Sequence, residues 1–66
     1  MTASPEVYRS ASVLVEQYGE RARAEAISIA EALLAKGDAM GHKVWLAIAK
    51  AIDELLLDQR EPARTA

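Results

Sequence analysis

Several features that stabilise very small proteins are missing from this sequence. Its 66 residues contain no cysteine, so no disulfide forms, and one histidine without any thiol gives a structural zinc ion too few ligands. A single core in a chain of this size rarely contributes more than about 3–5 kcal/mol. Oligomerisation is the stabilising device that remains. The lack of cysteine also fits a reducing compartment, and we expect the protein to be cytoplasmic.

A surplus of positive charge and long apolar runs are missing too. The chain has 8 Lys and Arg against 10 Asp and Glu, for a net charge of −2. Proteins that neutralise many phosphates need more Lys and Arg than this, so nucleic acid is not the expected partner. The sequence shows neither the basic and apolar pattern of a secretory signal nor the roughly 20 apolar residues that cross a bilayer. We therefore expect no membrane association.

The residues that are abundant favour helix. Alanine occurs fourteen times, beside many Leu, Ile and Glu and no Phe. Ser4 followed by Pro5 is typical of a helix start, with Ser as the N-cap. Gly19 and Gly37 stand where a glycine in the left-handed conformation ends a helix. Asp38 then predicts the N-cap of the next helix.

These signals predict an all-α fold with one domain and short turns. The expected helices cover about residues 5–18, 20–36 and 39–58, within a single helical domain at 4–58. We expect a disordered N-terminus at 1–3 and a frayed C-terminal tail at 59–66, where no periodicity is seen. Turns this short predict that neighbouring helices fold back on one another.

One apolar stripe on each helix predicts the core. Apolar residues recur at spacings of three and four, which is the pattern of packed helices. The predicted core comprises Leu14, Tyr18, Ala26, Leu33, Gly41, Trp45, Ile48, Ile52 and Leu55.

A second apolar stripe lies about 100° around each helix from the first. Aligned apolar residues on every helix suggest an interface, since a three-helix monomer leaves much of that surface wet. We predict a homodimeric helical bundle in which this stripe lies at the interface, although another protein is a possible partner. In the alternative, the helices cross steeply and each buries a wider face. The predicted interface comprises Tyr8, Val15, Ile27, Leu34, Leu46 and Leu57.

The stretch KGDAMGHKVW, residues 36–45, holds two of the three glycines, the only histidine and the only tryptophan. Gly41 shares a face with Trp45, which predicts close packing at a tight corner. An anion site at the start of this helix is the alternative. Asp38 already occupies that positive end and disfavours it. His42 lies at the edge of the predicted buried face.

No arrangement of residues indicates catalysis. The sequence has no Ser-His-acid or Cys-His pattern, no phosphate-binding glycine loop and no Glu-x-x-His pair for a di-metal site. We predict a non-catalytic protein with no cofactor and no metal. Its expected role is that of a self-associating protein-interaction module.

The second hypothesis is a small regulatory protein that binds DNA or RNA. The second and third helices superficially resemble a helix-turn-helix, whose recognition helix exposes basic residues at its N-terminal end. A dimer would then bring two sets of cationic residues into one footprint. These residues are Arg21, Arg23, His42, Lys43 and Lys50.

The sequence also resembles a group of short uncharacterised bacterial proteins. The resemblance rests on three motifs, YG..A at 18–22, L...GD..G...W..I at 33–48 and AI..L at 51–55. It covers about residues 11 to 56. The group has no assigned activity, so the resemblance implies a folded bacterial helical unit of unknown function.

Overall fold

A computed structural model describes residues 5–60 of the chain, with side chains to residue 58, and these residues are entirely helical apart from the turn at 36–38. Helix α1 covers Pro5–Tyr18, and a 3₁₀ turn, η1, covers Gly19–Arg21. Helix α2 covers Ala22–Ala35, and α3 covers Ala39–Arg60. The predicted segment 1–3, the predicted N-cap Ser4 and residues 61–66 of the predicted tail lie outside the described residues. Residues 59 and 60, predicted to belong to the tail, continue α3.

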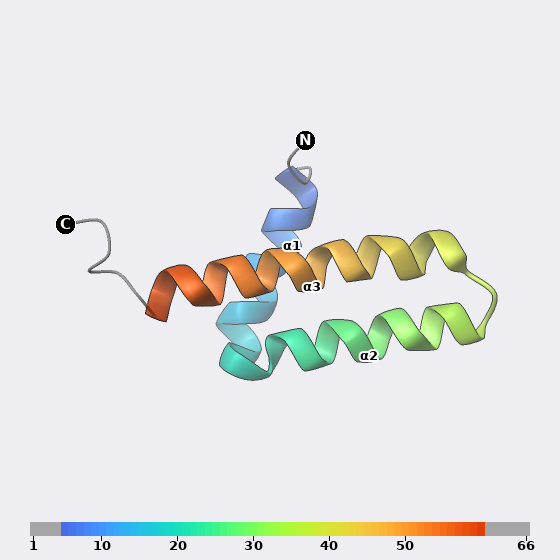
Figure 1. Cartoon of the computed structure of the whole chain (residues 1–66), viewed down its shortest axis with the longest axis horizontal. Coiled ribbons are helices and arrows are strands. Elements are labelled where there is room, and N and C mark those ends of the chain that lie inside the picture. The colour runs from blue at the N-terminus through green and yellow to red at the C-terminus, as the bar shows by residue number, and fades with distance from the viewer. Residues whose placement is uncertain (1–4, 61–66) are drawn as a thin grey trace.

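Helices α2 and α3 form an antiparallel hairpin, and α1 crosses behind it (Figure 1). The crossing is steep and lies over the C-terminal half of α3, away from the turn that joins α2 to α3. The half of the hairpin next to that turn therefore has no α1 against it. In the view of Figure 1, the face of the hairpin opposite α1 is turned toward the reader.

Two glycines set the ends of the first two helices, as predicted. Gly19 has φ +61° and Gly37 has φ +89°, a region that residues with a Cβ avoid. At the end of α2, the Gly37 amide donates to the Leu34 carbonyl and the Asp38 amide donates to the Leu33 carbonyl, both at 2.9 Å. This pair of bonds is the Schellman motif, and it satisfies carbonyls that the end of a helix leaves open.

Helix α2 begins two residues later than predicted. Residues 19–21 form a tight 3₁₀ turn, so the regular helix starts at Ala22 rather than at Glu20. Short 3₁₀ turns are frequent at the N-terminal ends of α-helices.

The core is built mainly from alanine. Of the nine buried apolar residues in the described part of the chain, six are alanine, and Ile52 is the largest side chain that is fully buried. Alanine lets helices approach closely, but it removes little apolar surface from water. The larger side chains lie around this core and remain partly exposed. Those packed against it are Val7, Tyr8, Leu14, Ile27, Trp45, Leu55 and Leu56.

The structure corrects two assignments on α1. Val15, predicted at an interface, is buried in the core, and Tyr18, predicted in the core, is 41% exposed. The physical reason is the steep crossing, because a helix that crosses its neighbours steeply buries its middle and leaves its ends in solvent. For α1, the structure therefore shows the alternative to an interface, in which the helices cross steeply and bury residues of the second stripe.

Candidate interaction surface

The stretch at residues 36–45 forms the turn between α2 and α3 and the start of α3, and most of its residues are exposed. Asp38 Oδ1 accepts a hydrogen bond from the Gly41 amide at 2.8 Å, and the Asp38 carbonyl accepts from the His42 amide at 3.0 Å. Asp38 is thus the N-cap of α3, as predicted. A Cβ on Gly41 would lie 2.6 Å from Asp38 Oδ2 and 3.1 Å from a methyl group of Leu33. A side chain at this position would displace the Asp38 carboxylate and the Leu33 methyl group, and the capping carboxylate occupies the position an anion would take.

His42 ties α3 to α2. Its Nδ1 lies 2.9 Å from the carbonyl oxygen of Ala30, and the residue is half-buried. Because a carbonyl only accepts hydrogen bonds, Nδ1 carries the proton that is donated. This bond gives the histidine a structural role in joining the two helices of the hairpin.

Two neighbouring acids of α3 bind different helices. Asp53 Oδ2 accepts from Arg23 Nε of α2 at 2.9 Å, and Glu54 accepts a hydrogen bond from the Tyr8 hydroxyl of α1. All of these groups are at least partly open to solvent, so each contact orients its helix more than it stabilises the fold. The Glu54 hydrogen bond, followed by desolvation and the Glu54 charge, raises the pKa of Tyr8 above its ordinary value.

The remaining predicted core residues are buried or half-buried, but Leu33 and Gly41 are not among those packed against the buried core. Ala26, Ile48 and Ile52 are buried. The others are half-buried, namely Leu14, Leu33, Gly41, Trp45 and Leu55.

The predicted interface residues divide into two groups. Tyr8 and Ile27 are half-buried against the core, and Val15 is inside it. The other three are largely in solvent, with exposed fractions of 50% for Leu34, 40% for Leu46 and 50% for Leu57.

These exposed side chains and Ile27 share the side of the hairpin that carries the Arg23–Asp53 ion pair. At about 100° per residue, Leu46 and Leu57 fall within about 40° of Asp53 around α3. On α2, the same count places Ile27 and Leu34 within about 40° of Arg23. We call the surface formed by Ile27, Leu34, Leu46 and Leu57 the open face.

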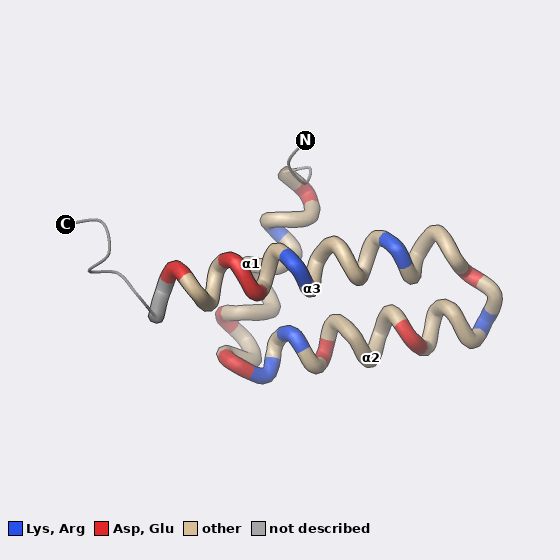
Figure 2. The backbone as a smooth tube through the Cα atoms, viewed as in Figure 1, with Lys and Arg blue, Asp and Glu red and all other residues tan. Residues whose placement is uncertain are grey.

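Charged residues accompany these leucines on the open face. Glu31 lies between Ile27 and Leu34 on α2, and Lys43 and Lys50 flank Leu46 on α3. Along α3 the basic residues come first and the acidic residues follow toward its C-terminal half (Figure 2). Within the described part of the chain, no ion pair is found for these three residues. Glu31 was not among the predicted interface residues, although its spacing from Ile27 and Leu34 places it beside them on the helix.

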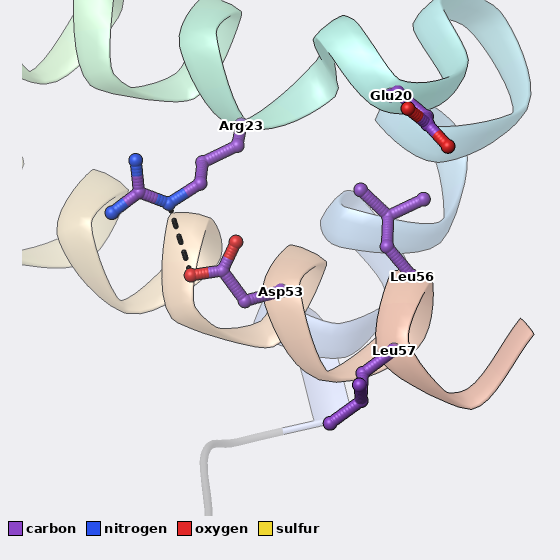
Figure 3. A pocket seen from close by; sticks show the side chains of 5 residues that line it. All are labelled: Glu20, Arg23, Asp53, Leu56 and Leu57. Carbon is purple, nitrogen blue, oxygen red and sulfur yellow. Dashed lines mark hydrogen bonds and ion pairs between the residues drawn. The ribbon is translucent and has the colours of Figure 1, made fainter. Parts of the chain in front are cut away.

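A shallow hollow opens at the end of the hairpin far from the turn. It has a volume of about 340 Å³ and is lined by Glu20, Arg23, Asp53, Leu56 and Leu57 (Figure 3). The ion pair between Arg23 and Asp53 crosses one side of it, and the two leucines lie on the other. Such a wide opening suits a side chain from another protein better than an enclosed substrate.

The residues of the nucleic-acid hypothesis are dispersed in the structure. Arg23 pairs with Asp53. Arg21 contacts Glu25 at 3.9 Å, one helical turn further along the chain, as an i, i+4 spacing on a helix predicts. Both arginines lie at the end of the hairpin opposite His42 and Lys43. The two helices also lie side by side, whereas those of a helix-turn-helix cross at about 90–120°.

Neither a metal site nor a membrane-spanning helix is found among the described residues. Within residues 5–58, no three His, Asp or Glu side chains come together in a way that would hold a metal ion. No described helix is long and apolar enough to cross a membrane.

Comparison with known proteins adds no relative. No protein-family model, curated protein or solved structure matches this chain. The resemblance to short bacterial proteins of unknown function stays a prediction.

Proposed function

We propose that this chain is a non-catalytic helical protein that associates with copies of itself and serves as a protein-interaction module. The observation that carries the proposal is the contrast between its core and its surface. Six of the nine buried apolar residues are alanine, while seven large apolar side chains of the described residues are exposed. Oligomerisation is a common way for a domain with a core this small to gain stability.

The cost of leaving these side chains in water supports association. Burying one leucine or valine side chain contributes roughly 1.5–3 kcal/mol. The three leucines of the open face are 40–50% exposed, so burying the rest of each would contribute about half of that value. Together they would contribute roughly 2–4.5 kcal/mol, which is comparable with the stability expected for so small a core. Protein-interaction surfaces typically combine such apolar groups with a polar rim, and the open face carries both.

The same surface disfavours catalysis as the role of the chain. Three titratable side chains, Tyr8, Arg23 and His42, make contacts that join one helix to another. The hollow itself is wide and shallow, and it lacks a nucleophile beside a base.

Light scattering behind size exclusion tests the proposal over a wide range of loading concentrations. We expect a mass near twice 7.2 kDa, with dissociation on dilution. The midpoint of thermal unfolding should also rise with protein concentration, because association stabilises the folded state by mass action. A cooperatively folded monomer whose melting temperature is the same at every concentration would overturn the proposal.

A further inference from the structure

We propose that the open face binds the open face of a second copy, with α2 of each chain lying over α3 of the other. This inference rests on the proposed function and specifies the surface, the partner and its orientation. Each step depends on the positions of the charged residues Glu31 and Lys43 and of the apolar residues Ile27 and Leu46.

The open face carries opposite charges on its two helices. Glu31 lies on α2, and Lys43 and Lys50 lie on α3, all three exposed. A surface that binds its own copy around a two-fold axis must be complementary to itself. An acidic helix beside a basic helix meets that condition when the two exchange places across the interface.

The register of the hairpin brings the opposite charges to the same level. Ala30 of α2 lies beside His42 of α3, where the ring nitrogen and the carbonyl oxygen are 2.9 Å apart. Glu31 and Lys43 directly follow these two residues, so they lie at one level of the hairpin to within a turn of helix. A two-fold axis parallel to the helices leaves every residue at its own level and exchanges the helices. Glu31 of one chain then faces Lys43 of the other.

The same rotation brings apolar residues together. Residue 27 lies between the Ala30–His42 and Arg23–Asp53 contacts of the hairpin, which places Ile27 about level with Leu46. Across the interface, Ile27 of one chain therefore packs against Leu46 of the other. Leu57 of each chain lies over the hollow at the end of the partner hairpin.

A two-fold axis perpendicular to the helices gives another face-to-face dimer, with α2 on α2 and α3 on α3. With that axis near the level of Ile27, Glu31 would approach Arg23 of the other chain, and Lys43 would approach Asp53. Arg23 and Asp53 are already paired with each other at 2.9 Å, whereas Glu31 and Lys43 have no partner in the described chain. The parallel axis pairs the two open charges and leaves the existing ion pair intact, so it is the arrangement we propose.

Charge reversal tests the contact. We expect Glu31→Lys or Lys43→Glu to raise the dimer dissociation constant roughly tenfold, since each change places like charges together twice per dimer. The double variant should recover dimerisation. An equimolar mixture of the two single variants should form a heterodimer, because each chain then presents the charge the other lacks.

Matched controls separate this effect from a general change in charge. Glu16→Lys and Arg9→Glu make the same changes at exposed positions of α1 and should leave the dissociation constant unchanged. Leu46→Asp should abolish dimerisation, while Val13→Asp, at a similarly exposed apolar position on α1, should not. Circular dichroism of every variant verifies that the helices persist.

The outcomes distinguish the two proposals. If the unmodified chain is a monomer throughout, the proposed function fails. If it is a dimer that Leu46→Asp leaves intact, self-association holds and the open face is the wrong surface. Suppose that Leu46→Asp breaks the dimer, but that neither the double charge variant nor the mixture restores the dimerisation weakened by the single charge reversals. The open face is then the right surface and the parallel axis is wrong.

Discussion

Asp38 and Gly41 form one tight unit at the start of α3. The Asp38 carboxylate accepts a hydrogen bond from the Gly41 amide at 2.8 Å, and its second oxygen lies 2.6 Å from where a Gly41 side chain would begin. The cap thus depends on the absence of a Cβ three residues later. This relationship explains why a glycine is placed inside a helix, where it costs roughly 0.5–1 kcal/mol relative to alanine.

Gly41→Ala is therefore expected to destabilise the protein by up to about 1 kcal/mol, despite the better helix propensity of alanine. The new methyl group displaces the Asp38 carboxylate, and losing an N-cap costs about 0.5–2 kcal/mol. In an Asp38→Ala background the cap is already gone and only the approach to Leu33 remains, so Gly41→Ala should cost less there than in the unmodified chain. A double-mutant cycle by chemical denaturation measures the coupling. Additive effects at the two sites would contradict this account.

Gly37→Ala is expected to destabilise the protein by about 1–2 kcal/mol, because a Cβ in the left-handed region meets backbone strain. The position has φ +89° and open space around it, so strain alone sets the cost. Gly37→Asn should cost less, because asparagine adopts this conformation more readily than alanine. Thermal unfolding of both variants provides the comparison, and equal losses would argue against strain as the cause.

Trp45→Ala is expected to cost about 2–4 kcal/mol, since the ring packs against the core although it is only half-buried. That loss approaches the stability of the whole domain. Circular dichroism under denaturant measures it, with Met40→Ala as the control. Met40 is 75% exposed on the same helix, and its truncation should change stability by less than about 0.5 kcal/mol. A Trp45→Ala variant as stable as the control would show that the ring is not part of the core.

The hydrogen bond between Tyr8 and Glu54 predicts a pH dependence at high pH. Glu54 raises the pKa of Tyr8 in the folded state above 10.0. Between the unfolded and folded pKa values the folded state binds more protons, so stability falls as pH rises through this window. The contribution is fully present below pH 10.0.

Ultraviolet absorbance of tyrosinate measures this titration directly. Tyr8→Phe assigns the transition, because it leaves one tyrosine in the chain. Glu54→Ala removes both the hydrogen bond and the charge, so the pKa of Tyr8 should return toward its ordinary value. A Tyr8 titration that is the same with and without Glu54 would rule out the contact in solution.

The apolar stripes predicted which residues are exposed better on α2 and α3 than on α1. The stripe pattern correctly placed Leu34, Leu46 and Leu57 outside the core, because α2 and α3 lie side by side and keep one face each for their contact. It misplaced Val15 and Tyr18 because a stripe gives the direction of a side chain around its helix and carries no information on the crossing angle. The sequence shows that Glu31, Lys43 and Lys50 are charged. It does not show which of them lie opposite one another in the α2–α3 hairpin.

The sequence by itself determined the local structure of this protein. Alanine-rich periodic segments, two glycines at positive φ and the Asp38 cap fix where the helices form and end, because these effects act over one or two turns of chain. The tertiary structure decided which apolar residues are buried and which remain on the open face. That outcome depends on where α1 crosses the hairpin, and the crossing is set by the fit of many side chains at once rather than by any local pattern.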